Sequence, residues 1–248
     1  RILQALGFEV KVGPVWRITP PSWRSDVQGK ADIAEEIARI AGYDKIPSVS
    51  VHSTASVPAS AETPTLSKIR KARATLTARG LDECVTWSFM NADLTKHFGL
   101  NDNKKRESVT IKNAISSEID VMRPSILPNL IQAAAKSAAL SYPDIAFCEI
   151  GPVFQSTKPE GQQIVAAGVR AGANSPRSWA DVNAARDVDV YDVKADALAA
   201  LEACGAPAAN AQITRDAPDY YHPGRSGAIR LGKNILAYFG EIHPAILD

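Results

Sequence analysis

The sequence has few cysteines and no excess of charge of either sign, and both absences narrow the classes of protein to consider. Its three cysteines, Cys84, Cys148 and Cys204, are far apart and form no CxxC pair. This spacing gives no basis for a disulfide framework or a zinc site, and it favours a reducing compartment such as the cytoplasm. The 28 lysines and arginines balance 27 acids, so no global electrostatic attraction to nucleic acid or to an anionic membrane is expected.

Long apolar runs are also absent. No segment approaches the roughly 18 consecutive apolar residues of a membrane helix, so we expect no membrane association. The chain has 248 residues, of which 45% are hydrophobic and 22% charged. Those values suit one large globular domain, or one domain and a smaller piece. The sequence starts at Arg1 without a methionine and stops just after a strand-like segment, so we expect both ends to be cuts through a longer protein.

Residues 1–47 have the pattern of a short helix, two strands and a second helix. Apolar and polar residues alternate over 8–12 and again over 16–19, as they do in half-buried strands. The second helix, expected over 32–41, ends at a glycine. This order is typical of a winged or other small α+β module that lacks its beginning. Residues 48–63 have little charge and many small side chains, which favours an extended linker or, alternatively, a strand lying on a neighbour.

Residues 64–248 are dominated by strand patterns between helical segments. Helices are expected over 64–80, 126–140 and 193–204, and strands over 85–89, 109–112, 145–150, 164–169, 187–192, 228–231 and 236–239. Because these strands follow one another without regular helical crossovers, the sequence predicts an α+β fold with a mostly antiparallel sheet flanked by helices.

The helix expected over 64–80 carries positive charge and no acid. Its cations are Lys68, Arg70, Lys71, Arg73 and Arg79. Two interpretations remain open for them. The helix is a solvated or partner-facing element, or its cations contact the phosphates of RNA.

Four carboxylates form the most suggestive chemical group: Asp26, Asp32, Glu35 and Glu36. Helical spacing places the last three on one face together with Arg39, and Asp26 precedes the helix in a loop that could fold back to them. Oxygen ligands of this kind suit Mg²⁺. The alternative is structural, because acids in the first turn stabilise a helix and Arg39 can pair with an acid one turn away.

Three further residues, Arg123, Glu149 and His222, are candidate functional residues. Arg123 opens an alanine-rich helix and Glu149 ends an apolar strand, so they form either a buried ion pair or a site in which Arg123 binds a phosphate or carboxylate. His222 precedes a Pro-Gly turn and has no nucleophile and acid beside it in the sequence. We therefore assign no catalytic and no cofactor-binding residue.

Several motifs resemble one family. Residues 21–26 read PSWRSD and residues 32–47 read DIAEEIARIAGYDKIP, which closely resembles the signature of bacterial phenylalanyl-tRNA synthetase β subunits. Further motifs follow in the order of that family, namely TWSF at 86–89, NAISSE at 113–118, MRPSILP at 122–128, YHPGRS at 221–226 and GEIHP at 240–244. The chain departs from the family at Ala114, where a proline is usual.

The resemblance implies a fold and a partnership. Residues 1–47 would be the C-terminal part of a winged-helix-like domain, and residues 64–248 a class II synthetase-like module that has lost catalysis. The family is an (αβ)₂ heterotetramer whose α subunit carries the active site and which joins phenylalanine to its tRNA with ATP and Mg²⁺. The resemblance also implies a Mg²⁺ site, shared with the α subunit, at Asp26, Asp32, Glu35 and Glu36.

Overall fold

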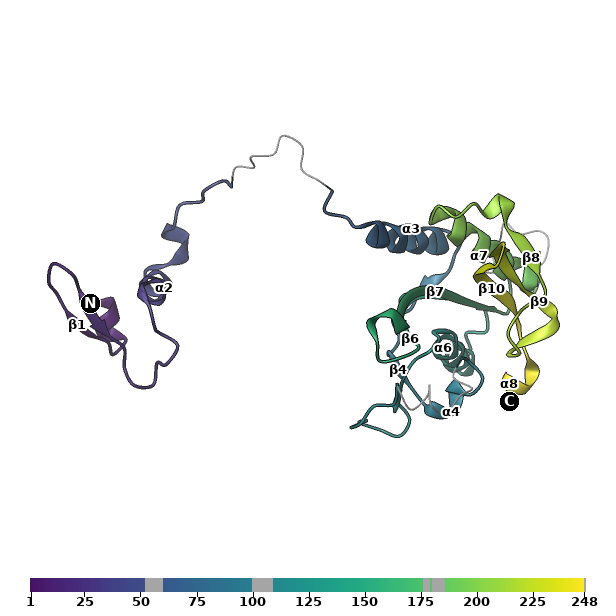
Figure 1. Ribbon diagram of the computed structural model, residues 1–248, viewed down its shortest axis with the longest axis horizontal. Coiled ribbons are helices and arrows are strands. Elements are labelled where there is room, and N and C mark those ends of the chain that lie inside the picture. Colours follow the sequence, from purple (N-terminus) through teal and green to yellow (C-terminus); the bar gives the residue numbers. More distant parts are fainter. Residues whose placement is uncertain (52–59, 100–108, 176–178, 180–185, 248) are drawn as a thin grey trace. The chain divides into compact units, whose positions relative to one another are not determined.

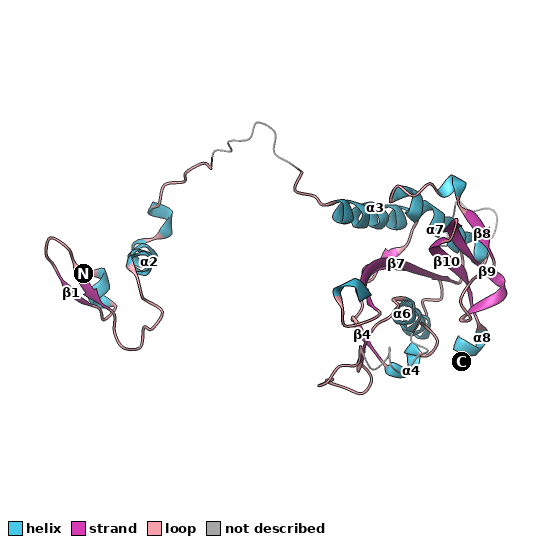
Figure 2. Cartoon of the chain, in the orientation of Figure 1, coloured by secondary structure: helices cyan, strands magenta, loops and turns pink. Residues whose placement is uncertain are grey.

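The computed structural model describes residues 1–51, 60–99, 109–175, 179 and 186–247. These residues form two compact units, Arg1–Ala59 and Ser60–Asp248 (Figures 1 and 2). The linker expected over 48–63 includes the boundary between the units, and its residues 52–59 lie outside the described part of the chain. The domain limits 1–47 and 64–248 stay predictions.

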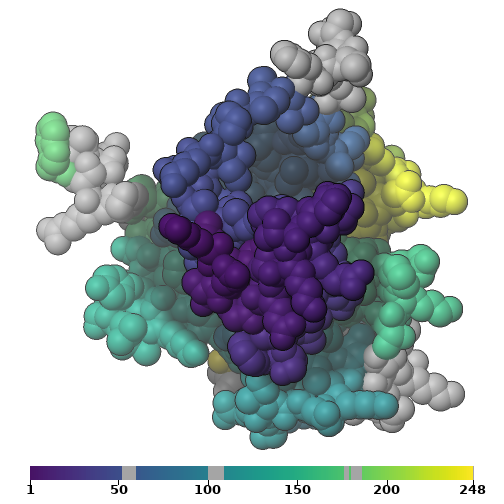
Figure 3. Space-filling model, turned by 90° about the vertical axis from the view of Figure 1, so that its left-hand side faces the viewer, coloured from purple at the N-terminus to yellow at the C-terminus, as the bar shows by residue number. Residues whose placement is uncertain are grey.

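The Arg1–Ala59 unit, whose surface is purple and blue in Figure 3, follows the expected order of helix, strand, strand and helix. Its elements are α1 (Ile2–Ala5), β1 (Glu9–Lys11), β2 (Arg17–Thr19), α2 (Lys30–Ala41) and the short 3₁₀ turn η1 (Tyr43–Lys45). The two strands pair antiparallel with Val10 opposite Ile18. Leu3, Phe8 and Val27 are buried together and form a small core.

The Ser60–Asp248 unit is a mixed α+β structure. Its helices are α3 (Pro64–Ala78), α4 (Ala92–Thr95), α6 (Leu127–Ala139), α7 (Val190–Ala203) and α8 (Pro244–Leu247), with 3₁₀ turns η2 (Pro159–Gly161) and η3 (Ala208–Asn210). Its strands are β3 (Asp82–Glu83), β4 (Phe89–Met90), β5 (Val121–Met122), β6 (Ile145–Phe154), β7 (Gln162–Ala171), β8 (Gln212–Thr214), β9 (Tyr221–Leu231) and β10 (Asn234–Ile242).

Antiparallel pairs dominate these strands, as the sequence predicts. The strand orders are β3-β6-β7, β10-β9-β8 and β4-β5. Strands β6 and β7 pair along their whole length, from Ile145 opposite Ala171 to Phe154 opposite Gln162. The exception is β3, which runs parallel to β6. In the part of the chain that the structure describes, no helix is long and apolar enough to cross a membrane.

Helices cover both faces of the β3-β6-β7 sheet. On one face Cys148 of β6 packs with Leu76 of α3 and with Leu81, and α3 lies beside α7 (Figure 1). On the other face Val153 packs with Ile126 and with Leu130 of α6. The alternation of side chains along β6 therefore divides the core of this unit into two layers.

The strand expected over 187–192 is wrong, because α7 begins there at Val190. The carboxylate of Asp189 accepts hydrogen bonds from the backbone N–H groups of Tyr191 and Asp192, at 2.8 and 3.3 Å. Asp192 returns a hydrogen bond by accepting the N–H of Asp189 at 2.9 Å. This reciprocal cap starts a helix in a segment whose apolar and polar residues alternate like those of a strand.

Candidate functional site

The guanidinium of Arg24 holds two of the four carboxylates of the proposed metal group. Its Nε and Nη2 donate to Asp26 Oδ1 and Oδ2 at 2.9 and 2.7 Å. Its Nη1 and Nη2 donate to Glu36 Oε2 and Oε1 at 3.0 and 2.9 Å. Arg39 adds a hydrogen bond of 2.8 Å to Glu36 Oε2. The turn before α2 thus places the Arg24 guanidinium between the carboxylates of Asp26 and Glu36.

The other two carboxylates lie in different surroundings. Asp32 Oδ2 accepts the backbone N–H groups of Gln28 and Gly29, both at 2.8 Å, at the start of α2. These two hydrogen bonds lower the pKa of the Asp32 carboxyl. Glu35 is exposed, and its carboxylate has no hydrogen-bond or ion-pair partner among the described residues. The structural role at the start of the helix is therefore present at Asp32.

The donor chemistry of the four carboxylates fits Mg²⁺, which binds oxygen ligands. Their arrangement is incomplete, because the described ranges contain no group of three or more His, Cys, Asp or Glu residues placed to hold a metal ion. The Mg²⁺ site at Asp26, Asp32, Glu35 and Glu36 stays a prediction.

The ion pairs of Glu36 predict that the Arg1–Ala59 unit loses stability in acid. Hydrogen bonds from Arg24, and then from Arg39, lower the pKa of Glu36 from 4.5 to about 2. The stabilising effect of this carboxylate is complete above pH 4.5 and is lost as the pH falls through about 2. We expect the urea concentration at the midpoint of unfolding to fall as the pH is lowered from 4.5 to about 2. The NMR amide signals of α2 report this unfolding. The variant Glu36→Gln should show a flatter profile, and an equally steep fall in that variant would contradict the assignment.

A second polar group is buried between β6 and the loop before α6. Arg123 is 1% exposed and Glu149 3% exposed, and Arg123 Nη1 donates to Glu149 Oε1 at 2.7 Å. Thr86 connects the pair, since its Oγ1 accepts from Arg123 Nη1 at 2.9 Å and donates to Glu149 Oε2 at 2.6 Å. The remaining Nε donates to the carbonyl of Pro152 at 2.9 Å. The two interpretations of Arg123 and Glu149 were a buried ion pair and a site for a phosphate or carboxylate. The structure shows the buried ion pair.

The backbone of β6 leaves room for this guanidinium at Gly151. A Cβ built there would lie 2.6 Å from Arg123 Nη2 and 3.4 Å from Glu149 Oε1. The φ angle of Gly151 is not in the left-handed region, so space rather than backbone conformation makes glycine the residue that fits.

Three of the five cations of residues 64–80, counting Arg79 just after the last residue of α3, pair with acids outside the helix. Arg70 pairs with Glu62, Arg73 with Glu83, and Arg79 with Asp196, whereas Lys68 and Lys71 have no ion-pair partner among the described residues. These pairs neutralise most of the charge that suggested an RNA contact. The structure therefore favours the interpretation of α3 as a solvated or partner-facing helix over that of an RNA contact.

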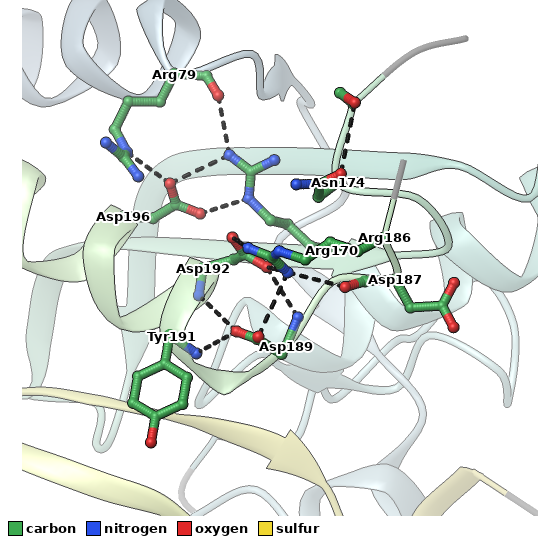
Figure 4. Close-up of polar contacts among 10 residues, drawn as sticks. Arg79, Arg170, Asn174, Arg186, Asp187, Asp189, Tyr191, Asp192 and Asp196 are labelled. Atoms are coloured by element: carbon green, nitrogen blue, oxygen red, sulfur yellow. Dashed lines mark hydrogen bonds and ion pairs between the residues drawn. The ribbon is translucent and has the colours of Figure 1, made fainter. Parts of the chain in front are cut away.

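Asp196 of α7 joins three elements through two arginines (Figure 4). Its Oδ1 accepts from Arg79 Nε at 2.6 Å and its Oδ2 from Arg170 Nε of β7, also at 2.6 Å. Arg170 Nη2 also donates to the backbone carbonyl of Arg79 at 2.9 Å. Nearby, Arg186 forms a two-pronged pair with Asp192, with N–O distances of 2.7 and 2.6 Å. Ion pairs thus fix both the start and the middle of α7.

The YHPGRS and GEIHP motifs meet at one end of the β8-β9-β10 sheet. Ser226 lies opposite Gly240, and Tyr221 opposite Ile242. Their side chains contribute to a cavity of about 300 Å³ lined by Arg215, Ala217, Pro218, Asp219, Tyr221, Pro223, Ser226 and His243. Ser226 Oγ donates to the carbonyl of His222 at 2.7 Å and not to a base. The cavity therefore holds no nucleophile activated by a neighbouring base among the described residues.

Sequence reasoning found the acids and the pairing of Arg39 with an acid one turn away, but it missed Arg24. Arg24 stands two residues before Asp26, and an excess of acid over 26–36 is the signal that pointed to a nearby cation. Arg170 and Asp196 lie in a strand and a helix with no shared motif, so the sequence offers no comparable signal for their pair.

Comparison with known proteins matches nearly the whole chain to two family models of tRNA synthetases. The family model described as "Phenylalanyl tRNA synthetase beta chain CLM domain" matches residues 46–248, and the "tRNA synthetase B5 domain" model matches residues 1–43. The phenylalanine–tRNA ligase β subunit of Rhodospirillum rubrum is 47% identical over 247 residues, which are 99% of this chain and 30% of that protein. The β subunit of Cereibacter sphaeroides is 48% identical over 246 residues, which are 99% of this chain and 29% of that protein. The chain thus spans about 30% of the length of these relatives.

Two solved structures share the fold at low sequence identity. The crystal structure of pyrrolysyl-tRNA synthetase from Desulfitobacterium hafniense has a TM-score of 0.53 and 18% identity, and the match covers 74% of this chain and 60% of that one. A second pyrrolysyl-tRNA synthetase structure from that organism has a TM-score of 0.50 and 16% identity, with 70% and 55% covered. These neighbours have the class II synthetase fold. On its family matches and sequence identities, the chain belongs to the family of phenylalanine–tRNA ligase β subunits.

Proposed function

We propose that this chain is a non-catalytic part of a phenylalanine–tRNA ligase β subunit and assembles with the catalytic α subunit. The whole enzyme would be a cytoplasmic (αβ)₂ heterotetramer that joins phenylalanine to its tRNA with ATP and Mg²⁺. The observation that carries the proposal is the identity of 47–48% to β subunits over 99% of the chain. The order of elements in the Arg1–Ala59 unit and the B5 match support its being part of a winged-helix-like domain.

The pairing of Arg123 supports the non-catalytic role. Class II catalysis uses an arginine on the sheet to hold the phosphates of ATP, and Arg123 is the candidate in this sequence. Its Nε and Nη1 already donate to Pro152, Thr86 and Glu149, and its side chain is 2% exposed. A phosphate would have to break this buried network to reach the guanidinium.

Co-expression with a matching α subunit tests the assembly. We expect the chain to elute with α as one complex in size-exclusion chromatography, and phenylalanine-dependent ATP–pyrophosphate exchange only in samples that contain α. Each subunit alone is the control. Exchange catalysed by this chain without α would overturn the non-catalytic role.

We further propose that Asp26, Asp32, Glu35 and Glu36 supply part of a Mg²⁺ site that the α subunit completes. The oxygen donors support this, and so does the carboxylate of Glu35, which is exposed and without a partner among the described residues. A partner that brings further oxygens would provide the six ligands that Mg²⁺ requires. When bound, the cation would neutralise carboxylates at the contact between subunits.

Binding of Mn²⁺, a spectroscopic substitute for Mg²⁺, tests this site in the assembled enzyme. We expect Glu35→Gln to weaken Mn²⁺ binding by about tenfold in titrations followed by electron paramagnetic resonance, since one charged ligand is lost. Glu9→Gln is the matched control, because Glu9 is an exposed acid of the same unit. Equal effects of the two substitutions would remove Glu35 from the site.

A further inference from the structure

We propose that the cavity at the end of the β8-β9-β10 sheet binds a free α-amino acid whose side chain is apolar. Its volume of about 300 Å³ is at the lower end of the range for small-molecule sites. Residues of the YHPGRS and GEIHP motifs line it together with the 215–219 loop, and the proposed assembly leaves these motifs without a role. Every lining residue belongs to this chain, so the inference goes beyond the proposed function.

Backbone pairing and ring packing fix the walls of the cavity. Tyr221 lies opposite Ile242 in the β9–β10 pair, and the N–H of His243 donates to the carbonyl of Tyr220 at 2.9 Å. The ring of Tyr221 packs on that of Tyr220, with centroids 4.7 Å apart. Tyr220 packs in turn on the buried ring of Phe98, also at 4.7 Å. The cavity is therefore formed before a ligand binds, as most small-molecule sites are.

Two opposite charges line the cavity and are not paired. Arg215 and Asp219 are exposed, and neither side chain has an ion-pair or hydrogen-bond partner in the part of the chain that the structure describes. They do not pair with each other, although both line this cavity. The neighbouring Asp216 differs, since it pairs with Arg230 at 2.6 Å. A ligand that carries an anion and a cation close together would satisfy both Arg215 and Asp219.

Apolar groups form another part of the lining. Ala217, Pro218 and Pro223 supply aliphatic carbon, and Tyr221 supplies a ring. Small-molecule sites combine apolar walls, which bind by burying hydrocarbon, with a few polar groups that orient the ligand. We therefore expect an aliphatic side chain to lie against these residues.

His243 adds a hydrogen-bond donor to the cavity. Its Nδ1 accepts the backbone N–H of Ala245 at 3.2 Å, so the proton of the neutral imidazole is on Nε2, from which it can be donated to a carboxylate. Arg215 and His243 would hold the carboxylate of the ligand, and Asp219 would hold its ammonium group. This set of groups fits the charged end of an α-amino acid.

Three ligands test the proposal on the unmodified chain. Leucine carries both charges, isocaproate lacks the ammonium group, and leucinamide lacks the carboxylate. We expect leucine to shift the NMR amide signals of residues 215–226 with a dissociation constant of about 1 mM. Each of the other two ligands should bind at least about tenfold more weakly, because one charged contact is lost.

Two results of this titration would contradict the proposal. Binding of isocaproate or leucinamide as tight as that of leucine would overturn the assignment to a ligand with both charges. The absence of a saturable shift in residues 215–226 up to about 50 mM leucine would overturn the site itself.

Substitutions then test the role of each charge. We expect Arg215→Gln and Asp219→Asn each to weaken leucine binding by about tenfold. Asp219→Asn should leave the weaker binding of isocaproate unchanged, since that ligand has no ammonium group. The controls are Lys233→Gln and Glu202→Gln, which remove exposed charges of the same unit outside the cavity, and changes of less than about twofold are expected. Controls that weaken binding as much as Arg215→Gln would overturn the location.

The outcome of these titrations is separate from that of co-expression with an α subunit. A chain that binds leucine in the cavity but does not elute with α would overturn the proposed function and leave this inference intact. A chain that elutes with α and shows no saturable leucine binding would overturn this inference alone.

Discussion

Replacement of Glu149 by alanine is expected to destabilise the Ser60–Asp248 unit by about 3–5 kcal/mol, because it leaves Arg123 as a buried cation without its anion. Arg123 is 1% exposed, so water cannot replace the lost carboxylate. Thr86 would also lose the acceptor of its hydroxyl proton, which lies 2.6 Å away. Urea unfolding monitored by circular dichroism measures the change in the free energy of unfolding.

Two controls define the origin of this loss. Glu83→Ala removes a carboxylate whose ion pair with Arg73 is partly exposed, and an effect of about 0–1 kcal/mol is expected. The double variant Arg123→Met with Glu149→Met removes both charges and should recover much of the stability lost in Glu149→Ala. A double variant as unstable as Glu149→Ala would show that the loss reflects packing rather than an unpaired charge.

The second large effect is expected at Asp196, whose loss would bring two arginines together without an acid. Arg170 and Asp196 have side chains 10% and 9% exposed, whereas Arg79 is 36% exposed. Because water reaches Arg79, we expect Asp196→Ala to destabilise the unit by about 2–3 kcal/mol, less than a fully buried pair. The same urea experiment measures this change.

Asp216→Ala is the matched control for Asp196. Its carboxylate is 60% exposed and pairs with Arg230, so a loss of only about 0–1 kcal/mol is expected. Similar losses in the two variants would mean that Asp196 does not hold α3, β7 and α7 together.

Hydrophobic periodicity predicts the longer helices and strands of this fold, whereas the strands expected over 85–89 and 109–112 correspond only to Phe89 of β4 and to an isolated bridge at Thr110. The helices expected over 64–80 and 126–140 correspond to α3 and α6, and the long strands β6 and β7 contain the segments expected over 145–150 and 164–169. In each of these elements the apolar residues recur with the period of a helix or a strand, and the face they form packs against the core. The segment 187–192 differs, because its alternation is that of a strand while the cap at Asp189 starts a helix.

The ion pairs between segments that are distant in the sequence cannot be predicted from the sequence. The cations of α3 are visible in the sequence, but Glu83 and Asp196, which neutralise two of them, belong to a strand and a distant helix. For Arg24 the limit is different, since it stands two residues from Asp26 and twelve from Glu36 in the sequence. Its two-sided contact depends on the fold of the turn before α2, and spacing alone does not specify that turn.

The residues allowed at positions 123 and 151 depend on each other. A side chain at 151 would enter the volume of the Arg123 guanidinium, since its Cβ would lie 2.6 Å from Nη2. Substitution of Gly151 alone is therefore disfavoured while Arg123 is present. A shorter apolar residue at 123 would free that volume, and alanine at 151 would then fit. In relatives that lack the arginine, the glycine is therefore expected to be replaced as well. The two positions are expected to co-vary.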